Sequence, residues 1–336
     1  MRPDVLSSMR DAEGRRSEIL AKNRVRSLLK IWLAVVCASV LLLAACGSPA
    51  AKLEAQKLEA DAYRREVAKW QAGRASELTS ANGWLTLVGL FWLKEGENRF
   101  GGDASNEITL PQGKVAPFAG SLWLEGGAVR LEARKGVGIT HEGKPVDRLV
   151  LQSDADGQPT VLNIGSISFH TIKRGERTGL RVRDTDNPAR SNFAGLDFYP
   201  VEPAWRVEAR FEPYDPSKMI PIVNVLGMVE EQESPGALVF EVGGKSYRLD
   251  AIREKGSEQL FIIFADQTSG RETYGAGRYL YADPPRDGRA ILDFNKAYNP
   301  PCAFTNYATC PLPPSQNRLA LRIEAGEKRY AAESTH

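Results

Sequence analysis

Histidine is scarce in this chain, and its scarcity limits the chemistry that the sequence can support. Only three histidines occur among 336 residues, and His336 is the last residue. A Ser–His or Cys–His nucleophile pair would therefore have to use His141 or His170, and no Gly-x-Ser-x-Gly elbow is present. The His-x-x-x-His and Cys-x-x-Cys spacings of zinc sites are absent as well. We expect no metal and no cofactor, and the sequence identifies no catalytic residue.

The chain also lacks a large net charge. The 44 basic and 42 acidic residues give a formal charge of +2. Residues 1–45 hold eight of the basic and four of the acidic residues, so the remainder is close to neutral. A nucleic-acid surface needs a basic excess on one face to neutralise phosphates. We therefore expect no nucleic-acid partner.

Only four cysteines occur, and Cys46 follows an apolar run near the N-terminus. Basic residues precede the run "IWLAVVCASVLLLAA", which spans residues 31–45 and is too short for a membrane span of about 20 residues. The run and the cysteine together resemble the lipobox of bacterial lipoproteins. That resemblance implies a signal peptide over residues 1–45 that is removed, and acylation of the Cys46 thiol. Two or three acyl chains give stable anchoring where one does not.

The expected location is the cell envelope, with the protein held at a membrane by its lipid anchor. Gly47 rather than aspartate follows the cysteine. In the lipoprotein sorting pattern this residue implies the outer membrane, facing the periplasm, if the organism is Gram-negative. An uncleaved anchor helix with an incidental cysteine is the alternative.

The next segment, residues 46–82, reads as a short tether followed by a helix. Its sequence from Ala51 to Ser80 is rich in strong helix formers and contains no proline. Leu53, Leu58 and Val67 belong to an imperfect apolar stripe. The stripe favours a spacer helix that docks one face on the domain, and a partner-binding coiled coil is the alternative.

From about residue 83 onward, short runs rich in β-branched and aromatic residues predict a mainly β protein. Examples are "SISFHTI", "GLRVRD", "QLFIIFAD" and "LALRIEA", separated by turn signals such as "DADGQ" and "VGGK". We expect an antiparallel β-sandwich over residues 83–170. A second antiparallel β barrel or sandwich is expected over residues 171–330, with a Pro/Cys-rich loop at 299–319.

The first of these units resembles a forkhead-associated (FHA) domain. The residues that carry the resemblance are Gly101, Asn106, Glu107, Ile108 and the turn Gly143-Lys144-Pro145-Val146. The phosphothreonine-binding residues of that family are missing: Gly102 stands where the family has arginine, and "APFAGS" replaces its Ser-x-x-His loop. A phosphate dianion needs a fork donor such as arginine. The resemblance therefore implies the sandwich fold, and no phosphopeptide binding is expected.

Residues of about 60–328 resemble the DUF1684 family of uncharacterised bacterial proteins. The motifs that carry this resemblance include "GLRVRDTDNPAR", "TSGRETYGAGRYLYAD" and "NPPCAFTNYATCPLPPSQNRL". The family has no established activity, so the resemblance implies kinship and assigns no catalytic residue.

Two polar motifs contain the residues most typical of a ligand site. Strand alternation places Arg181 and Arg183 on one face, with Val182 on the other, and it places Glu272 and Tyr274 on a common face. The candidate ligand-binding residues are Arg181, Arg183, Asp184, Glu272, Tyr274 and Arg278. Converging in a barrel mouth, they could bind a carboxylate or phosphate ligand. An ion-pair network that only specifies the fold is the alternative.

After removal of the signal peptide and acylation of Cys46, the remaining thiols are Cys302 and Cys310. In an oxidising compartment they are candidates for a disulfide that closes a small loop. Two buried free thiols are an alternative, and a catalytic or metal-binding role is a third.

The function expected from the sequence is that of a lipid-anchored module that binds a small-molecule or envelope ligand or supports the envelope structurally. The competing hypothesis is an extracytoplasmic hydrolase acting on an envelope component. A hydrolase predicts a concave site with a titratable pair of shifted pKa near Arg181, Asp184, Glu272 and Tyr274.

Overall fold

The computed structural model describes residues 49–330. The expected signal peptide and the lipidation site Cys46 lie outside the described residues. The chain forms two compact units, residues 1–62 and 63–336, and the division falls within helix α2 (Pro49–Thr79). Within residues 49–330, no helix combines the length and the apolar character needed to cross a membrane.

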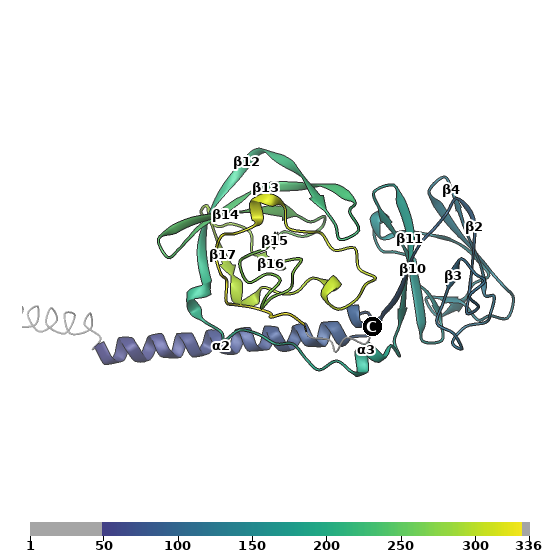
Figure 1. Ribbon diagram of the computed structural model, residues 1–336, viewed down its shortest axis with the longest axis horizontal. Helices are drawn as coiled ribbons and strands as arrows, with labels where there is room; N and C mark the ends of the chain where they lie inside the picture. The colour runs from purple at the N-terminus through teal and green to yellow at the C-terminus, as the bar shows by residue number, and fades with distance from the viewer. Residues whose placement is uncertain (1–48, 331–336) are drawn as a thin grey trace, which may run out of the picture. The chain divides into compact units, whose positions relative to one another are not determined.

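Helix α2 confirms the expected N-terminal helix (Figure 1). Proline at its first position fits the first turn, where no backbone donor is needed. Leu53 and Leu58, in the unit that ends at Ala62, are 68% and 63% exposed. In the unit that begins at Tyr63, Val67 and Leu78 are fully buried, and their spacing of 11 residues keeps them on one helix face.

The first β region, residues 84–184, is an antiparallel sandwich apart from one parallel strand pair. One sheet has the order β1-β11-β10-β9-β6-β7 and the other the order β3-β2-β4-β5-β8. The strands are β1 (Leu87–Trp92), β2 (Gly96–Gly101), β3 (Ile108–Thr109), β4 (Gly120–Glu125), β5 (Ala128–Ala133), β6 (Thr140–His141), β7 (Lys144–Pro145), β8 (Arg148–Leu151), β9 (Leu162–Ile164), β10 (Ile167–Arg174) and β11 (Arg177–Asp184). The boundary expected between residues 170 and 171 falls inside β10, and the sandwich continues to Asp184.

The core of this sandwich follows the two-residue period of its strands. Phe169, Leu180 and Val182 are fully buried between the two sheets, next to Phe100 and Leu131 from the opposite sheet. The outer face of an antiparallel sandwich sheet commonly meets water. Strand β11 departs from this pattern, because residues 178–182 are buried without interruption. Another part of the chain therefore covers the outer face of β11.

A connecting segment with helix α3 (Pro188–Ser191) leads to the second β region, residues 206–330. Its six-stranded antiparallel sheet has the order β16-β15-β14-β13-β12-β17. The strands are β12 (Arg206–Val223), β13 (Val229–Val242), β14 (Lys245–Arg253), β15 (Leu260–Phe264), β16 (Arg278–Ala282) and β17 (Arg289–Asp293). Leu238, Phe240 and Phe294 belong to the core on one face of this sheet.

Strand β15 is buried on both faces. Leu260, Ile262 and Phe264 belong to the main core, whereas Phe261 and Ile263 join a second cluster on the opposite face. The expected strand "LALRIEA" is wrong: residues 319–325 form no regular strand, although Leu319, Ile323 and Ala325 still alternate into the main core. The fold class expected from the sequence, mainly β with an N-terminal helix, is confirmed.

Candidate functional site

The covered face of β11 borders a cavity of about 780 Å³. The walls come from the end of α2, Trp84, the outer face of β10 and β11, the β12–β16 face of the second region, and the Pro/Cys-rich loop. The lining side chains are Trp70, Arg74, Glu77, Trp84, Arg174, Arg181, Ile222, Asn224, Glu230, Gln232, Ile252, Glu254, Phe261, Ile263, Tyr279, Tyr281, Tyr298, Pro301, Ala308, Thr309, Cys310 and Pro311, and Gly73 completes the wall on α2.

The β10–β11 wall of the cavity is cationic. His170 lies directly opposite Arg181 in the antiparallel register, and Arg174 lies opposite Arg177. Residues directly opposite on antiparallel strands share a face, so these side chains lie on the outer face of the sheet. Arg183 shares that face and donates hydrogen bonds to the Gly83 carbonyl at 2.8 Å and to Thr86 Oγ1 at 3.1 Å.

Arg181 differs from its neighbours because its charge has no partner. Its side chain is only 5% exposed, and its Nε has no hydrogen-bond partner. Among residues 49–330, no carboxylate forms an ion pair with it, and its guanidinium carbon lies 5.5 Å from the centre of the Trp84 ring. Burial, followed by the positive charge of Arg174, lowers the pKa of Arg181 to about 10. This guanidinium is therefore charged and poorly compensated at neutral pH.

His170 responds to the same environment. Burial, followed by the charges of Arg181 and Arg183, lowers the pKa of His170 to about 4. The imidazole is neutral at physiological pH. One carboxylate, Asp154, faces this group, and it already pairs with Arg174 at 2.9 Å. The wall therefore has more positive than negative charge.

The wall from the second region is aromatic. Tyr281 stacks on Phe261 with ring centres 5.0 Å apart, and it lies nearly parallel to Tyr298 at 6.3 Å. The Tyr279 ring meets Phe261 edge-on at 5.0 Å. Tyr281 remains 37% exposed, and its hydroxyl donates to Glu254 at 2.7 Å. These rings form an aromatic cluster that lines the cavity, and the Tyr281 hydroxyl lies at its edge.

Arg74 joins the helix to this aromatic wall. Its guanidinium lies 4.7 Å from the centre of the Tyr298 ring, and its Nε lies 3.1 Å from the buried Glu327 carboxylate. Arg74 also donates to the carbonyl of Asn299 at 2.9 Å. The Arg74 charge is thus satisfied, in contrast to that of Arg181.

The Pro/Cys-rich loop supplies Cys310 to the cavity wall. Cys302 and Cys310 are both free thiols in the structure, so the disulfide expected from the sequence is not formed there. The two residues are nevertheless adjacent, since the Cys302 backbone N–H donates to the Cys310 sulfur at 3.0 Å. The side-chain interaction with Cys302 and burial raise the pKa of Cys310, whereas the side-chain hydrogen bond with Cys310 lowers that of Cys302. Cys310 is buried and Cys302 is half-buried, and the disulfide between them stays a prediction.

The structure separates the six candidate ligand-binding residues. Arg181 and Arg183 share a face beside Trp84, as alternation predicts, and Arg181 lines the cavity. Asp184 binds the Lys114 ammonium at 2.6 Å. Tyr274 lies beside the cysteine loop, where its hydroxyl donates to the Cys302 carbonyl at 2.9 Å.

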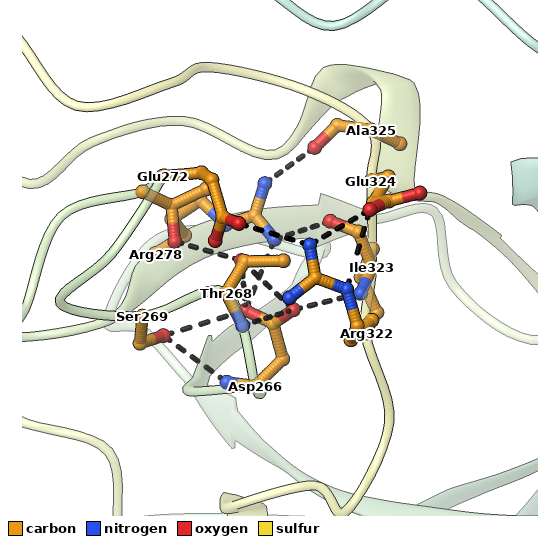
Figure 2. A network of polar contacts seen from close by, with 10 residues as sticks. Asp266, Thr268, Ser269, Glu272, Arg278, Arg322, Ile323, Glu324 and Ala325 are labelled. Carbon is orange, nitrogen blue, oxygen red and sulfur yellow. Dashed lines mark hydrogen bonds and ion pairs between the residues drawn. The ribbon is translucent and has the colours of Figure 1, made fainter.

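Glu272 and Arg278 belong to a different polar network, shown in Figure 2. Arg278 is fully buried, pairs with Asp266 at 3.2 Å and donates to the Ile323 carbonyl at 3.0 Å. Glu272 forms an exposed ion pair with Arg322 at 3.0 Å. This network ties the β15–β16 connection to the C-terminal segment, as the fold-specifying alternative predicts.

The expectation that Glu272 and Tyr274 share a strand face is wrong. The backbone carbonyl of Thr268 accepts from the N–H groups of residues 271, 272 and 273, so this segment turns instead of extending. Strand alternation therefore does not apply to it.

Several cavity residues were not among the sequence candidates, notably Trp84, Arg174, Tyr281 and Tyr298. A weak signal existed for Tyr281, because the alternating run "RYLYAD" places Tyr279 and Tyr281 on one strand face. Within residues 49–330, no group of three or more His, Cys, Asp or Glu side chains is placed to hold a metal ion.

The comparisons with known proteins match parts of the chain. A search of the curated proteins gave no match. A solution structure of an uncharacterised protein from Haloarcula marismortui is 33% identical, covers 44% of this chain and 81% of its own, and gives a TM-score of 0.36.

Two FHA-domain structures are also similar to part of the chain. One comes from a study of phosphothreonine-dependent FHA interactions, with 22% identity, coverage of 29% of this chain and 96% of its own, and a TM-score of 0.21. The other is the FHA domain of FhaA complexed with the intracellular domain of Rv3910, with 21% identity, coverage of 28% and 97%, and a TM-score of 0.20.

A match to a family of proteins of unknown function covers residues 191–328, a narrower range than the 60–328 expected from the motifs. The matched range contains the second β region almost entirely, including the aromatic wall and the Pro/Cys-rich loop. Residues 191–328 of this chain are therefore similar to the DUF1684 family of proteins of unknown function.

Proposed function

We propose that this protein is a ligand-binding module of the cell envelope, held at a membrane through acylated Cys46, and that its cavity takes a small organic molecule. The observation that carries the proposal is the cavity itself. Its volume of about 780 Å³ lies within the range of about 300–1,000 Å³ that is typical of ligand pockets. Its lining of aromatic rings with a few polar groups is also typical of such pockets.

Binding is favoured over hydrolysis by where the titratable groups lie. The hydrolase hypothesis needs a titratable pair close to Arg181, but Asp184 is held by Lys114 and Glu272 by Arg322. His170 lies directly opposite Arg181 and is neutral, and no carboxylate hydrogen-bonds to it within residues 49–330. A phosphopeptide is not proposed as the ligand, because Gly102 offers no fork donor.

Substitutions at Gly73 test directly whether the cavity binds a ligand. Gly73 lies in α2 on the cavity wall, and a Cβ added there meets no atom within 4 Å. Gly73→Trp should therefore fill part of the cavity without a clash, and Gly73→Ala is the matched control that only adds the Cβ. Both changes remove a helix-interior glycine, which favours the helix by up to about 1 kcal/mol.

The experiment is native mass spectrometry of the protein isolated from the envelope of its own host. We expect a small-molecule mass excess on the wild type and on Gly73→Ala, and its loss from Gly73→Trp. The same spectrum for all three proteins would contradict a ligand-binding cavity.

For the anchor, Cys46→Ser should move the protein from the membrane fraction to the soluble fraction, and unchanged membrane retention would refute lipidation at Cys46.

A further inference from the structure

The cavity wall at β11 contains a positive charge, that of Arg181, with which no carboxylate of residues 49–330 forms an ion pair. Four guanidinium groups, those of Arg174, Arg177, Arg181 and Arg183, lie on the outer face of β10 and β11. Asp154 pairs with Arg174, and the carboxylates that line the cavity, those of Glu77, Glu230 and Glu254, form no ion pair with Arg181 among the described residues. Arg183 is satisfied by a carbonyl and a hydroxyl oxygen. Arg181 has only the face of Trp84.

An unpaired buried charge is costly, because desolvation is not repaid by an opposite charge or by hydrogen bonds. Arg181 is more than nine-tenths buried in the described fold, and it borders the cavity rather than a packed core. Its guanidinium can offer a planar fork of donors to a carboxylate or phosphate group. A bound anion would supply the missing partner from the cavity side.

The opposite wall defines the remainder of the ligand. Tyr281 and Phe261 present stacked rings, and Tyr281 keeps part of its surface exposed. Tyr298 extends the same surface at an interplanar angle of 15° to Tyr281. Flat aromatic walls of this kind favour a ring-bearing ligand, because rings stack with an energy beyond simple area burial.

We propose that the cavity binds a ring-bearing organic anion, with its carboxylate, phosphate or sulfonate group on Arg181 and its ring against Tyr281 and Phe261. This inference rests on the proposed ligand-binding function and specifies the ligand class. Arg181 is the residue that selects for the anion, and the aromatic wall is the part that selects for the ring.

Two fluorescent probes that differ only in charge test the inference. Anilinonaphthalene sulfonate carries an anionic group, and phenylnaphthylamine is its uncharged parent. Trp70 and Trp84 line the cavity, so energy transfer from tryptophan reports binding there. We expect the wild type to bind the sulfonate at least about tenfold more tightly than the parent, as one charge-assisted contact allows.

Variants of Arg181 distinguish the contribution of the anionic group to binding from that of the cavity. Arg181→Gln should weaken sulfonate binding by about 10- to 100-fold and leave the uncharged parent within about twofold. Arg177→Gln is the matched control: it removes the same charge from the same strand, but the side chain is exposed over Trp92 and does not line the cavity. Arg181→Lys keeps the charge without the fork, so it should retain intermediate affinity, and it serves as the test if Arg181→Gln does not fold.

Each alternative outcome overturns a defined statement. If the two probes bind with equal affinity and the Arg181 variants change neither affinity, the assignment of an anionic ligand is wrong. In that case, loss of binding of both probes in Gly73→Trp would still support the ligand-binding function. If Gly73→Trp leaves both affinities unchanged, the probes do not use the cavity, and the proposed function fails together with the inference.

Discussion

Arg181→Met is expected to stabilise the ligand-free protein, although it removes a large buried side chain. Burial is the main cause that lowers the pKa of Arg181 from its ordinary value to about 10. At about 1.4 kcal/mol for each pKa unit, this depression corresponds to roughly 3 kcal/mol of opposition to folding. Methionine retains much of the buried aliphatic volume. It loses the contact with Trp84, which is worth about 0.5–2 kcal/mol. The expected net gain is about 1–2 kcal/mol.

The sign follows from the two protonation equilibria. At pH 7 the guanidinium is charged in both the folded and the unfolded chain, because both pKa values lie above that pH. The folded protein holds the proton more weakly, so the charge disfavours folding by its full amount below about pH 10. The penalty disappears only as the pH rises from the folded pKa towards the unfolded value. The stabilisation by Arg181→Met should therefore be constant across neutral pH.

Equilibrium urea denaturation measures the effect as a higher midpoint with an unchanged slope. Arg183→Met is the matched control, because Arg183 is a neighbour on the same strand face but donates to Gly83 and Thr86. Its removal leaves the buried Gly83 carbonyl without that donor and should destabilise the protein by about 1–3 kcal/mol. A loss of 1 kcal/mol or more in Arg181→Met would refute the view that its charge is uncompensated.

Three further predictions concern other buried groups. His170 has a folded pKa of about 4, below its ordinary 6.5, so between these pH values the unfolded state binds a proton that the folded state does not. The free energy of unfolding should therefore fall as the pH decreases from 6.5 to 4. Urea denaturation should show a shallower fall in His170→Gln. Cys302 should react with iodoacetamide faster than Cys310 in the reduced, folded protein, because the pKa of Cys302 is lowered and that of Cys310 is raised; peptide mass mapping measures both rates. Asp266→Asn should destabilise the protein by about 3–5 kcal/mol in urea, because it leaves the fully buried Arg278 charge unpaired.

These three predictions have separate controls. Identical pH profiles for the wild type and His170→Gln would show that His170 is not desolvated. Equal alkylation of both thiols would contradict the asymmetry in their pKa values, and Cys310→Ser should slow Cys302 by removing its sulfur partner. Glu272→Gln is the control for Asp266→Asn, because it breaks an exposed ion pair and should leave stability unchanged.

The sequence predicted the features that depend on local periodicity. The β class, the N-terminal helix and the common face of Arg181 and Arg183 follow from residue spacing, which the backbone geometry of strands and helices fixes. The prediction that Glu272 and Tyr274 share a strand face was wrong, because three backbone hydrogen bonds to the Thr268 carbonyl make a turn there, and strand alternation does not apply to a turn.

The cavity could not be predicted in this way. Its walls join Trp84 and Arg181 to Tyr281 and Tyr298, residues about 100 or more positions apart. Which sheet faces meet is set by tertiary packing rather than by propensity or period. The uninterrupted burial of β11 is visible only once the sandwich is built, since "GLRVRD" alternates like a strand with one face in water.

The two-sided burial of β11 has a practical consequence for dissecting the protein. A fragment that ends after Asp184 would contain an intact sandwich core, yet it would open Arg181 and Trp84 to solvent and remove the aromatic wall. A fragment with only the DUF1684 residues would keep that wall and lose its cationic counterpart. Screening either piece alone for ligands would thus sample half a binding site, and library searches for this protein should use the chain from Tyr63 to Tyr330.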